Sequence, residues 1–129
     1  AWIETGTVYD LMQRATAGAV ASGTATLEAA CLGLPYALVY HVNWLTYLVG
    51  KTVVRIQHLG MVNILAKREV VKELVQHALT PDTLAAEMLR LLTSAEARAA
   101  LQQDLAAVTA TLGQPGAYHR AADILARHL

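Results

Sequence analysis

The sequence predicts an α/β fold, with a short parallel sheet, several helices and a helical C-terminal third. Two apolar runs, residues 17–21 and 36–40, have the composition of buried strands, and helical patterns surround both. Such short strand–helix–strand spacing predicts parallel pairing through right-handed crossovers. A doubly wound sheet has about five or six strands, so two strands predict the end of such a fold.

The first elements can be read in order from the apolar spacing. Residues 8–15 have helical spacing, and residues 17–21 follow as the first strand. The next helix is expected to begin near Gly23, with Ala25, Ala29 and Leu32 on one face. Gly33 and the proline two residues later are stop signals, and the second strand, residues 36–40, comes next.

The rest of the chain is predicted to contain further helices, with a helical C-terminal third. Residues 43–56 and 60–79 are both expected to contain helix. Thr80, Pro81 and Asp82 then form a strong helix start: an N-cap, a first-turn proline and a carboxylate that the helix dipole favours. The expected buried stripes of the last three helices are Leu84, Met88 and Leu91; Ala97, Leu101, Leu105, Val108 and Leu112; and Ala117, Ala121, Ile124, Leu125 and His128.

Composition excludes several classes of function. The chain has 129 residues, 55% of them apolar, which suffices for one domain with a core. Ten basic and ten acidic residues give a formal net charge of zero, so the chain lacks the overall positive charge that attracts nucleic acid. The single cysteine, Cys31, excludes an intrachain disulfide, suits a reducing compartment and is expected to pack as a small hydrophobe. No signal peptide or membrane-spanning run is visible, so we expect a soluble domain of a longer protein.

A Ser-Gly-Thr turn follows the first predicted strand and starts the next helix. This places Ser22, Gly23 and Thr24 at the carboxyl edge of the sheet, where parallel sheets bind ligands and helix N-termini attract anions. Glu28 is four residues beyond Thr24, on the same helix face, where a carboxylate suits a vicinal diol such as ribose. The alternative is an ordinary helix start, with Ser22 as the N-cap and Glu28 solvated.

The residues of three segments carry a family resemblance. "ASGTATLEAACLGLPYALVY", "WLTYLVGKTVV" and "VNILAKREVVKELVQ" resemble, in the same order, the C-terminal region of the lipid-A-disaccharide synthase family. The resemblance implies a two-domain glycosyltransferase of the GT-B type with Rossmann-like domains. Residues 1–129 would be the latter part of its UDP-sugar-binding domain, and the N-terminal acceptor domain would be absent.

The resemblance also implies a reaction and roles for residues. The family transfers 2,3-diacylglucosamine from its UDP donor to 2,3-diacylglucosamine 1-phosphate, and it releases UDP with inversion. Ser22, Gly23 and Thr24 would contact the UDP phosphates and Glu28 the ribose. No cofactor or metal is implied, and the five histidines lack metal-ligand spacing. The catalytic base is expected outside this chain.

The second motif implies contacts near the donor. Asn63, Arg68 and Glu69 match an Asn and an Arg-Glu pair beside the active cleft, and a guanidinium suits a phosphate or carboxylate. The alternative for Arg68 is a surface ion pair with Glu69 or Glu73. The sequence departs from the family at His41, where Arg is usual.

Partners and localisation follow from the same reasoning. Since the substrates are acylated, we expect a cytoplasmic protein that contacts the inner membrane of a Gram-negative-type bacterium peripherally. The basic side chains for this contact are Lys51, Arg55, Lys67, Arg68 and Lys72, beside the apolar residues 44–54, which alternatively pack in a core. The other functions considered are a non-catalytic, self-associating packing module, which would give a homodimer, and part of a nonhydrolysing UDP-sugar epimerase.

Overall fold

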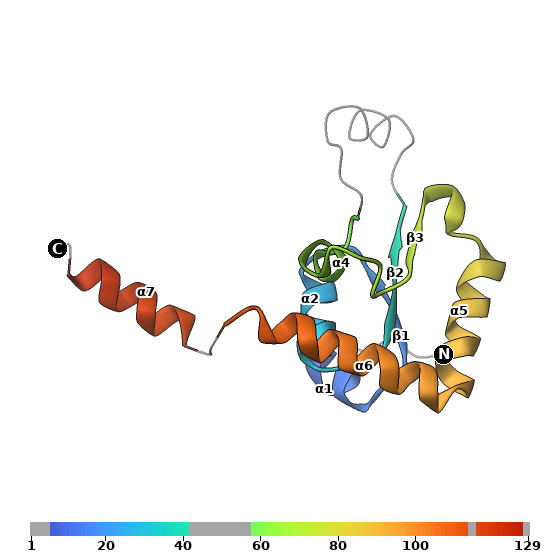
Figure 1. The fold of residues 1–129 in the computed structure, drawn as a ribbon, viewed down its shortest axis with the longest axis horizontal. Coiled ribbons are helices and arrows are strands. Elements are labelled where there is room, and N and C mark those ends of the chain that lie inside the picture. Colours follow the sequence, from blue (N-terminus) through green and yellow to red (C-terminus); the bar gives the residue numbers. More distant parts are fainter. Residues whose placement is uncertain (1–5, 42–57, 114–115, 128–129) are drawn as a thin grey trace.

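The computed structural model describes residues 6–41, 58–113 and 116–127. It confirms an α/β fold with a parallel sheet and a helical last third (Figure 1). The predicted helical segment 43–56 lies wholly outside the described residues. The elements are α1 (Val8–Arg14), β1 (Gly18–Ala21), α2 (Thr24–Cys31), β2 (Tyr36–Tyr40), α4 (Met61–Ala66), β3 (Glu73–Val75), the 3-10 turn η1 (Gln76–Ala78), α5 (Pro81–Thr93), α6 (Ala95–Ala110) and α7 (Ala117–Ala126).

The sheet has the order β1-β2-β3, and both pairings are parallel, as the strand–helix–strand pattern predicts. Gly18 pairs with Tyr36, and Leu38 pairs with Glu73. The central strand, β2, is the most deeply buried, whereas β1 lies at one edge of the described sheet. All strands run the same way, so their carboxyl ends share one edge, and the Ser22 turn follows β1 there.

The sequence-based prediction of only two strands was wrong, because β3 is a third. Residues 60–79 contain helix, as expected, but only over the six residues of α4; an irregular connection, a three-residue strand and a 3-10 turn follow it. Asn63 binds the backbone of the connection with its side chain, which draws Val70 and Val71 out of a helical path. Three residues are too few for a strand to show its period in the sequence.

Helices cover both faces of the sheet. Figure 1 shows α2 and α4 on one side and α5 on the other, while α6 crosses below and packs against α2, α4 and α5. The core combines Tyr36 and Leu38 of the sheet with apolar side chains of these helices. Its other buried members are Val20, Ala29, Ala30, Leu34, Val62, Val71, Leu91, Leu101, Leu105 and Val108.

The predicted start of α5 is confirmed in atomic detail. The Thr80 side chain accepts a hydrogen bond from the backbone N–H of Thr83, and the Thr83 hydroxyl in turn accepts from the backbone N–H of Thr80. In α6, three of the five predicted stripe residues are buried. Leu112, however, is 43% exposed, because it lies beyond the end of the helix.

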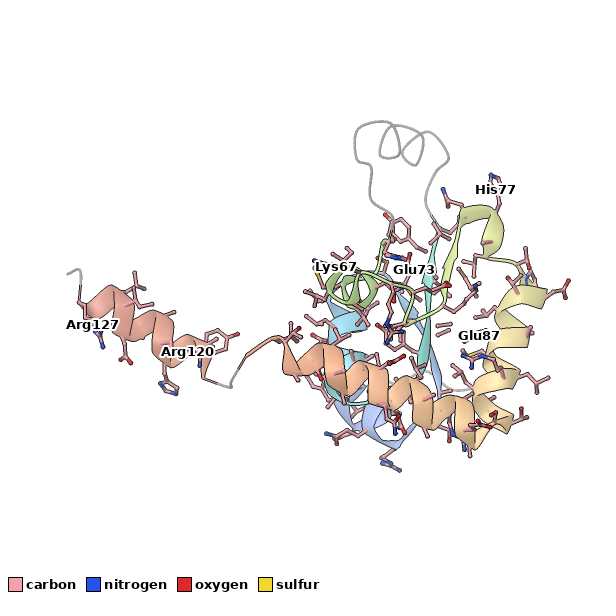
Figure 2. All side chains as sticks on the ribbon, in the orientation of Figure 1. Lys67, Glu73, His77, Glu87, Arg120 and Arg127 are labelled. Atoms are coloured by element: carbon pink, nitrogen blue, oxygen red, sulfur yellow. The ribbon has the colours of Figure 1, made fainter. Side chains whose placement is uncertain are left out.

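The final predicted helix is present as α7, but its expected buried stripe is not buried. No residue of α7 is buried, and Ile124 and Leu125 are 59% and 65% exposed. Figures 1 and 2 show α7 extending away from the sheet, with Arg120 and Arg127 far from the labelled Glu73. Each helix among the described residues is too short or too polar to span a bilayer.

Candidate functional site

A cleft of about 480 Å³ runs along the outer face of α2, between α1 and α4. Thr24 and Glu28 both line it, as their four-residue spacing predicts, and Gly23 lines its end at the helix N-terminus. The remaining lining is largely apolar and comes from all three helices. It consists of Tyr9, Leu27, Cys31, Leu32 and Met61.

The N-terminus of α2 is open to this cleft. The N-cap is Gly23, with a φ of +150° that side-chain-bearing residues rarely adopt, and no side chain caps the helix. Ser22 is therefore not the cap that the alternative reading required. Its backbone N–H instead donates to the carbonyl of Val39, which extends the pairing of β1 with β2. An uncapped N-terminus presents amide donors and a partial positive charge, which favour an anion.

Glu28 is held by a neighbour from another helix. The Tyr9 hydroxyl donates to Glu28 Oε1 over 3.2 Å. The negative charge of Glu28, together with this hydrogen bond, raises the pKa of Tyr9, which disfavours loss of the donated proton. A carboxylate has about four acceptor positions, and this contact uses one of them.

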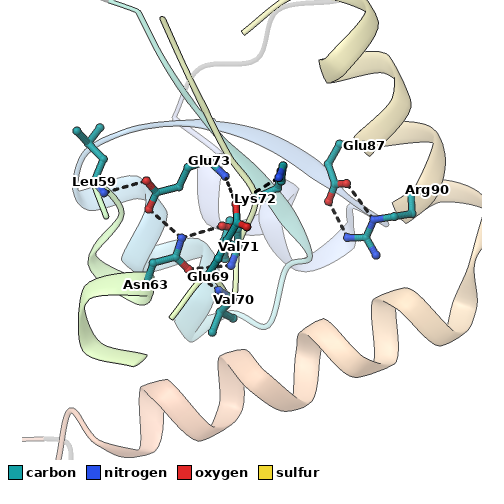
Figure 3. A network of polar contacts seen from close by, with 9 residues as sticks. All are labelled: Leu59, Asn63, Glu69, Val70, Val71, Lys72, Glu73, Glu87 and Arg90. Atoms are coloured by element: carbon teal, nitrogen blue, oxygen red, sulfur yellow. Dashed lines mark hydrogen bonds and ion pairs between the residues drawn. The ribbon is translucent and has the colours of Figure 1, made fainter. Parts of the chain in front are cut away.

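Asn63 lies in the interior, fully buried. Its Nδ2 donates to the carbonyl of Val71 and to Glu73 Oε1, both over 2.8 Å, and its Oδ1 accepts from the backbone N–H groups of Val70 and Val71 (Figure 3). An amide has two donors and two acceptor positions, so all four are used within the protein. Asn63 therefore does not line the cleft; its hydrogen bonds join α4 to the connection that follows it and to Glu73.

The carboxylate of Glu73 is the centre of this network, and sequence reasoning did not identify its role. It accepts hydrogen bonds from the backbone N–H groups of Leu59 and Gly60, each over 2.9 Å, in addition to the one from Asn63. A Cβ at position 60 would lie 2.7 Å from a methyl group of Leu38 and 3.2 Å from Glu73 Oε1, so both side chains would have to shift to admit one. Glu73 therefore fixes the N-terminus of α4, one residue before Met61 of the cleft lining.

Arg68 and Glu69 lie on the connection after α4, and neither lines the cleft. Arg68 forms an ion pair of 2.6 Å with Asp104 of α6, and this hydrogen bond raises the pKa of the guanidinium. The partner is thus neither Glu69 nor Glu73, the carboxylates expected from the sequence. Glu69 pairs over 3.5 Å with Lys72. Both pairs are largely exposed, so each contributes little to stability.

Sequence reasoning missed Tyr9 and Met61 as cleft residues. Tyr9 and Glu28 are 19 residues apart on separate helices, so only tertiary packing brings them together. Cys31, expected to pack as a small hydrophobe, is instead exposed on the cleft side of α2. Among residues 6–41, 58–113 and 116–127, no three His, Cys, Asp or Glu side chains gather as metal ligands.

Comparison with known proteins identifies the family. Residues 2–127 match the sequence model described as lipid-A-disaccharide synthetase. The chain is 44% identical over 117 residues to the lipid-A-disaccharide synthase of Syntrophus aciditrophicus and 43% identical to that of Persephonella marina, in each case over 91% of this chain. A relative from Anaeromyxobacter dehalogenans is 42% identical over 92% of the chain.

These matches cover only part of the relatives. The chain spans about 30% of the length of the Syntrophus protein and 31% of the Persephonella and Anaeromyxobacter ones. The match to the family covers nearly the whole of this chain. It includes the turn at residues 22–24, the residues that line the cleft, and Asn63 with its hydrogen-bond partners. The chain therefore belongs to the lipid-A-disaccharide synthetase family.

Proposed function

We propose that this chain is the latter, nucleotide-sugar-binding part of a GT-B glycosyltransferase. The longer enzyme would transfer 2,3-diacylglucosamine from its UDP donor to 2,3-diacylglucosamine 1-phosphate, forming the lipid A disaccharide and releasing UDP. The observation that carries the proposal is that Gly23, Thr24 and Glu28 line one cleft at an uncapped helix N-terminus. The names of the relatives support the reaction, and nothing favours an epimerase or a module without ligand.

The pyrophosphate would lie at the start of α2. Its negative charge would be stabilised there by the helix dipole and by backbone N–H groups. Thr24, which lines the cleft, and Ser22, which precedes Gly23 outside the cleft lining, would add hydroxyl donors. Gly23 has open space around the position of a Cβ, so a phosphate oxygen can approach the main chain closely. This arrangement would stabilise the charge that develops on the departing UDP.

The ribose would lie one helical turn further along, against Glu28. The step from Thr24 to Glu28 is about 6 Å along the axis, at 1.5 Å per residue, which is comparable to the separation of ribose from the phosphates. A carboxylate accepts two hydrogen bonds from a vicinal diol. The cleft volume of about 480 Å³ falls in the usual range of ligand sites.

For the second motif, the contacts suggest indirect roles. Because Asn63 has no donor or acceptor left over, we propose that it shapes the cleft through Glu73 and α4. Arg68 would have to break its ion pair with Asp104 before it could bind a phosphate of the donor. Glu69 would hold Lys72 in its ion pair and would not itself bind the donor. The general base that an inverting transfer needs would come from the acceptor domain.

The sheet itself supports the assignment to a larger domain. In the described residues β1 has a partner on one side only, and a doubly wound sheet would continue past it. We propose that residues 1–129 are the latter part of the UDP-sugar domain and that the missing strands and the acceptor domain belong to the rest of the enzyme.

Membrane contact and self-association belong to the proposal as well. Lys67, Arg68 and Lys72 are exposed and would face the anionic inner membrane, from the cytoplasmic side. Lys51, Arg55 and residues 44–54 lie outside the described residues. A homodimer would bury the apolar side chains of α7, and sedimentation at increasing concentration would test it.

A calorimetric titration with UDP tests the site. We expect the chain to bind UDP and Glu28→Ala to weaken binding about tenfold or more, because a hydrogen bond to a charged group is worth about 1.5–3 kcal/mol. Glu96→Ala, which removes an exposed carboxylate on α6, is the matched control and should bind as the parent does. Unchanged affinity in Glu28→Ala would remove Glu28 from the ribose role.

The lone cysteine provides a second readout of the same cleft. Cys31 is exposed and lines the cleft three residues beyond Glu28, and it is the only cysteine of the chain. Bound UDP should therefore slow its alkylation by iodoacetamide. Alkylation at the same rate with saturating UDP would place the nucleotide elsewhere.

A further inference from the structure

Tyr9 joins the candidate site from a helix outside the motifs that define the family resemblance. It lines the cleft from α1, and its hydroxyl donates to Glu28 Oε1 over 3.2 Å. Its side chain is 58% exposed, so burial in the core does not explain its position. The contact crosses between two helices, so it fixes the direction of the Glu28 carboxylate relative to the cleft.

The orientation of the Glu28 carboxylate decides which ligand hydroxyls can donate hydrogen bonds to it. A glutamate on a helix surface has three rotatable side-chain bonds, and ordering it against a ligand costs conformational entropy. A hydrogen bond that already holds one carboxylate oxygen lowers this cost before the ligand arrives. With one acceptor position occupied by Tyr9, the free positions of Oε1 and Oε2 remain for two neighbouring hydroxyls.

We propose that Tyr9 is a positioning residue: it presents the Glu28 carboxylate to both ribose hydroxyls and so makes the cleft select ribonucleotides over 2′-deoxyribonucleotides. This inference rests on the proposed nucleotide role of the cleft. It adds the residue that sets sugar specificity. The direction of the Tyr9 pKa agrees with it, since the nearby Glu28 charge raises that pKa and so disfavours loss of the proton that Tyr9 donates.

The test compares UDP with 2′-deoxy-UDP in calorimetric titrations of the parent chain, Tyr9→Phe and Tyr118→Phe. Tyr9→Phe keeps the ring and removes only the hydroxyl. Tyr118 is 92% exposed on α7, so Tyr118→Phe is a matched control for the loss of a phenol. Thermal unfolding of each variant confirms that it is folded.

We expect the parent to bind UDP about tenfold more tightly than 2′-deoxy-UDP, the worth of one hydrogen bond to a charged group. Tyr9→Phe should lose most of this preference, mainly through weaker UDP binding, while Tyr118→Phe retains it. In a Glu28→Gln background, Tyr9→Phe should have no further effect, since the residue acts through Glu28.

Three results would overturn the inference, and they separate it from the proposed function. If the parent binds UDP and Tyr9→Phe keeps the full ribose preference, Tyr9 does not position Glu28, although the nucleotide site stands. If Tyr9→Phe weakens both nucleotides equally, the hydroxyl acts on the fold or the cleft in general. If the parent binds no UDP at all, the proposed function and this inference both fail.

Discussion

At the scale of single residues, burial of the Tyr36 hydroxyl lowers the stability of the fold. The Tyr36 side chain is fully buried in β2, and among the described residues its hydroxyl is the one buried side-chain polar atom that makes no hydrogen bond of good geometry. Burial raises the pKa of this hydroxyl, and the Thr26 hydroxyl lowers that pKa only by a smaller amount. We expect Tyr36→Phe to raise the free energy of unfolding by about 1 kcal/mol at neutral pH, because the change removes a desolvated hydroxyl and keeps the ring. Denaturant unfolding measures this, and a less stable variant would mean that the hydroxyl is satisfied.

The same residue makes stability depend on alkaline pH. Burial is the main cause that raises the pKa of Tyr36 above its ordinary value of 10.0. Above pH 10 the unfolded chain therefore releases this proton while the folded chain keeps it, and stability falls by about 1.4 kcal/mol per pH unit. Tyr36→Phe should flatten this fall between pH 10 and 11, whereas the exposed-site variant Tyr118→Phe should not.

The sequence predicts some residue contacts and misses others for a physical reason. Thr24 and Glu28 share a face because helix periodicity is local, so their approach to one cleft is predictable. The ion pair of Arg68 with Asp104 joins residues 36 positions apart, and the Tyr9 contact with Glu28 joins residues 19 apart. Such contacts depend on how helices pack, which no local pattern encodes.

At the scale of elements, Glu73 ties β3 to the start of α4. We expect Glu73→Ala to lower the free energy of unfolding by about 2–3 kcal/mol, because it leaves the N–H groups of Leu59 and Gly60 and the Asn63 amide without their acceptor. Urea unfolding measures the change. Glu69→Ala, which removes a half-exposed carboxylate from the same segment, should cost less than about 1 kcal/mol. Equal losses in the two variants would contradict this role of Glu73.

Elements with explicit terminal signals were the predictable ones. Thr80 and Pro81 mark the start of α5, and Gly33 before Pro35 marks the end of α2, because capping and proline chemistry act over a few residues. In contrast, β3 has no such signal. It forms because its neighbour β2 offers a free edge, with Leu38 paired to Glu73, and that edge exists only after the fold has assembled.

At the scale of the whole molecule, α7 contributes little to the stability of the domain formed by the sheet and helices α1, α2, α4, α5 and α6. None of its residues is buried, so a variant that ends at Gly113 should unfold within about 2 °C of the complete chain. Differential scanning calorimetry checks this. Leu105→Ala in the fully buried part of α6 is the contrasting variant, and we expect it to cost about 2–5 kcal/mol. A large drop in the unfolding temperature on removing α7 would show that α7 packs against the sheet and its covering helices.

In the part of the chain that the structure describes, β1 has one edge without a neighbouring strand, and this edge has a consequence for handling the protein. Its four residues, Gly18 to Ala21, are small and apolar and carry neither the charge nor the proline that natural edge strands use against unwanted pairing. Such an edge can template strand addition between molecules in a concentrated solution. The chain should therefore be more prone to aggregate when it is expressed alone than in the longer enzyme that we propose, in which a further strand would cover this edge.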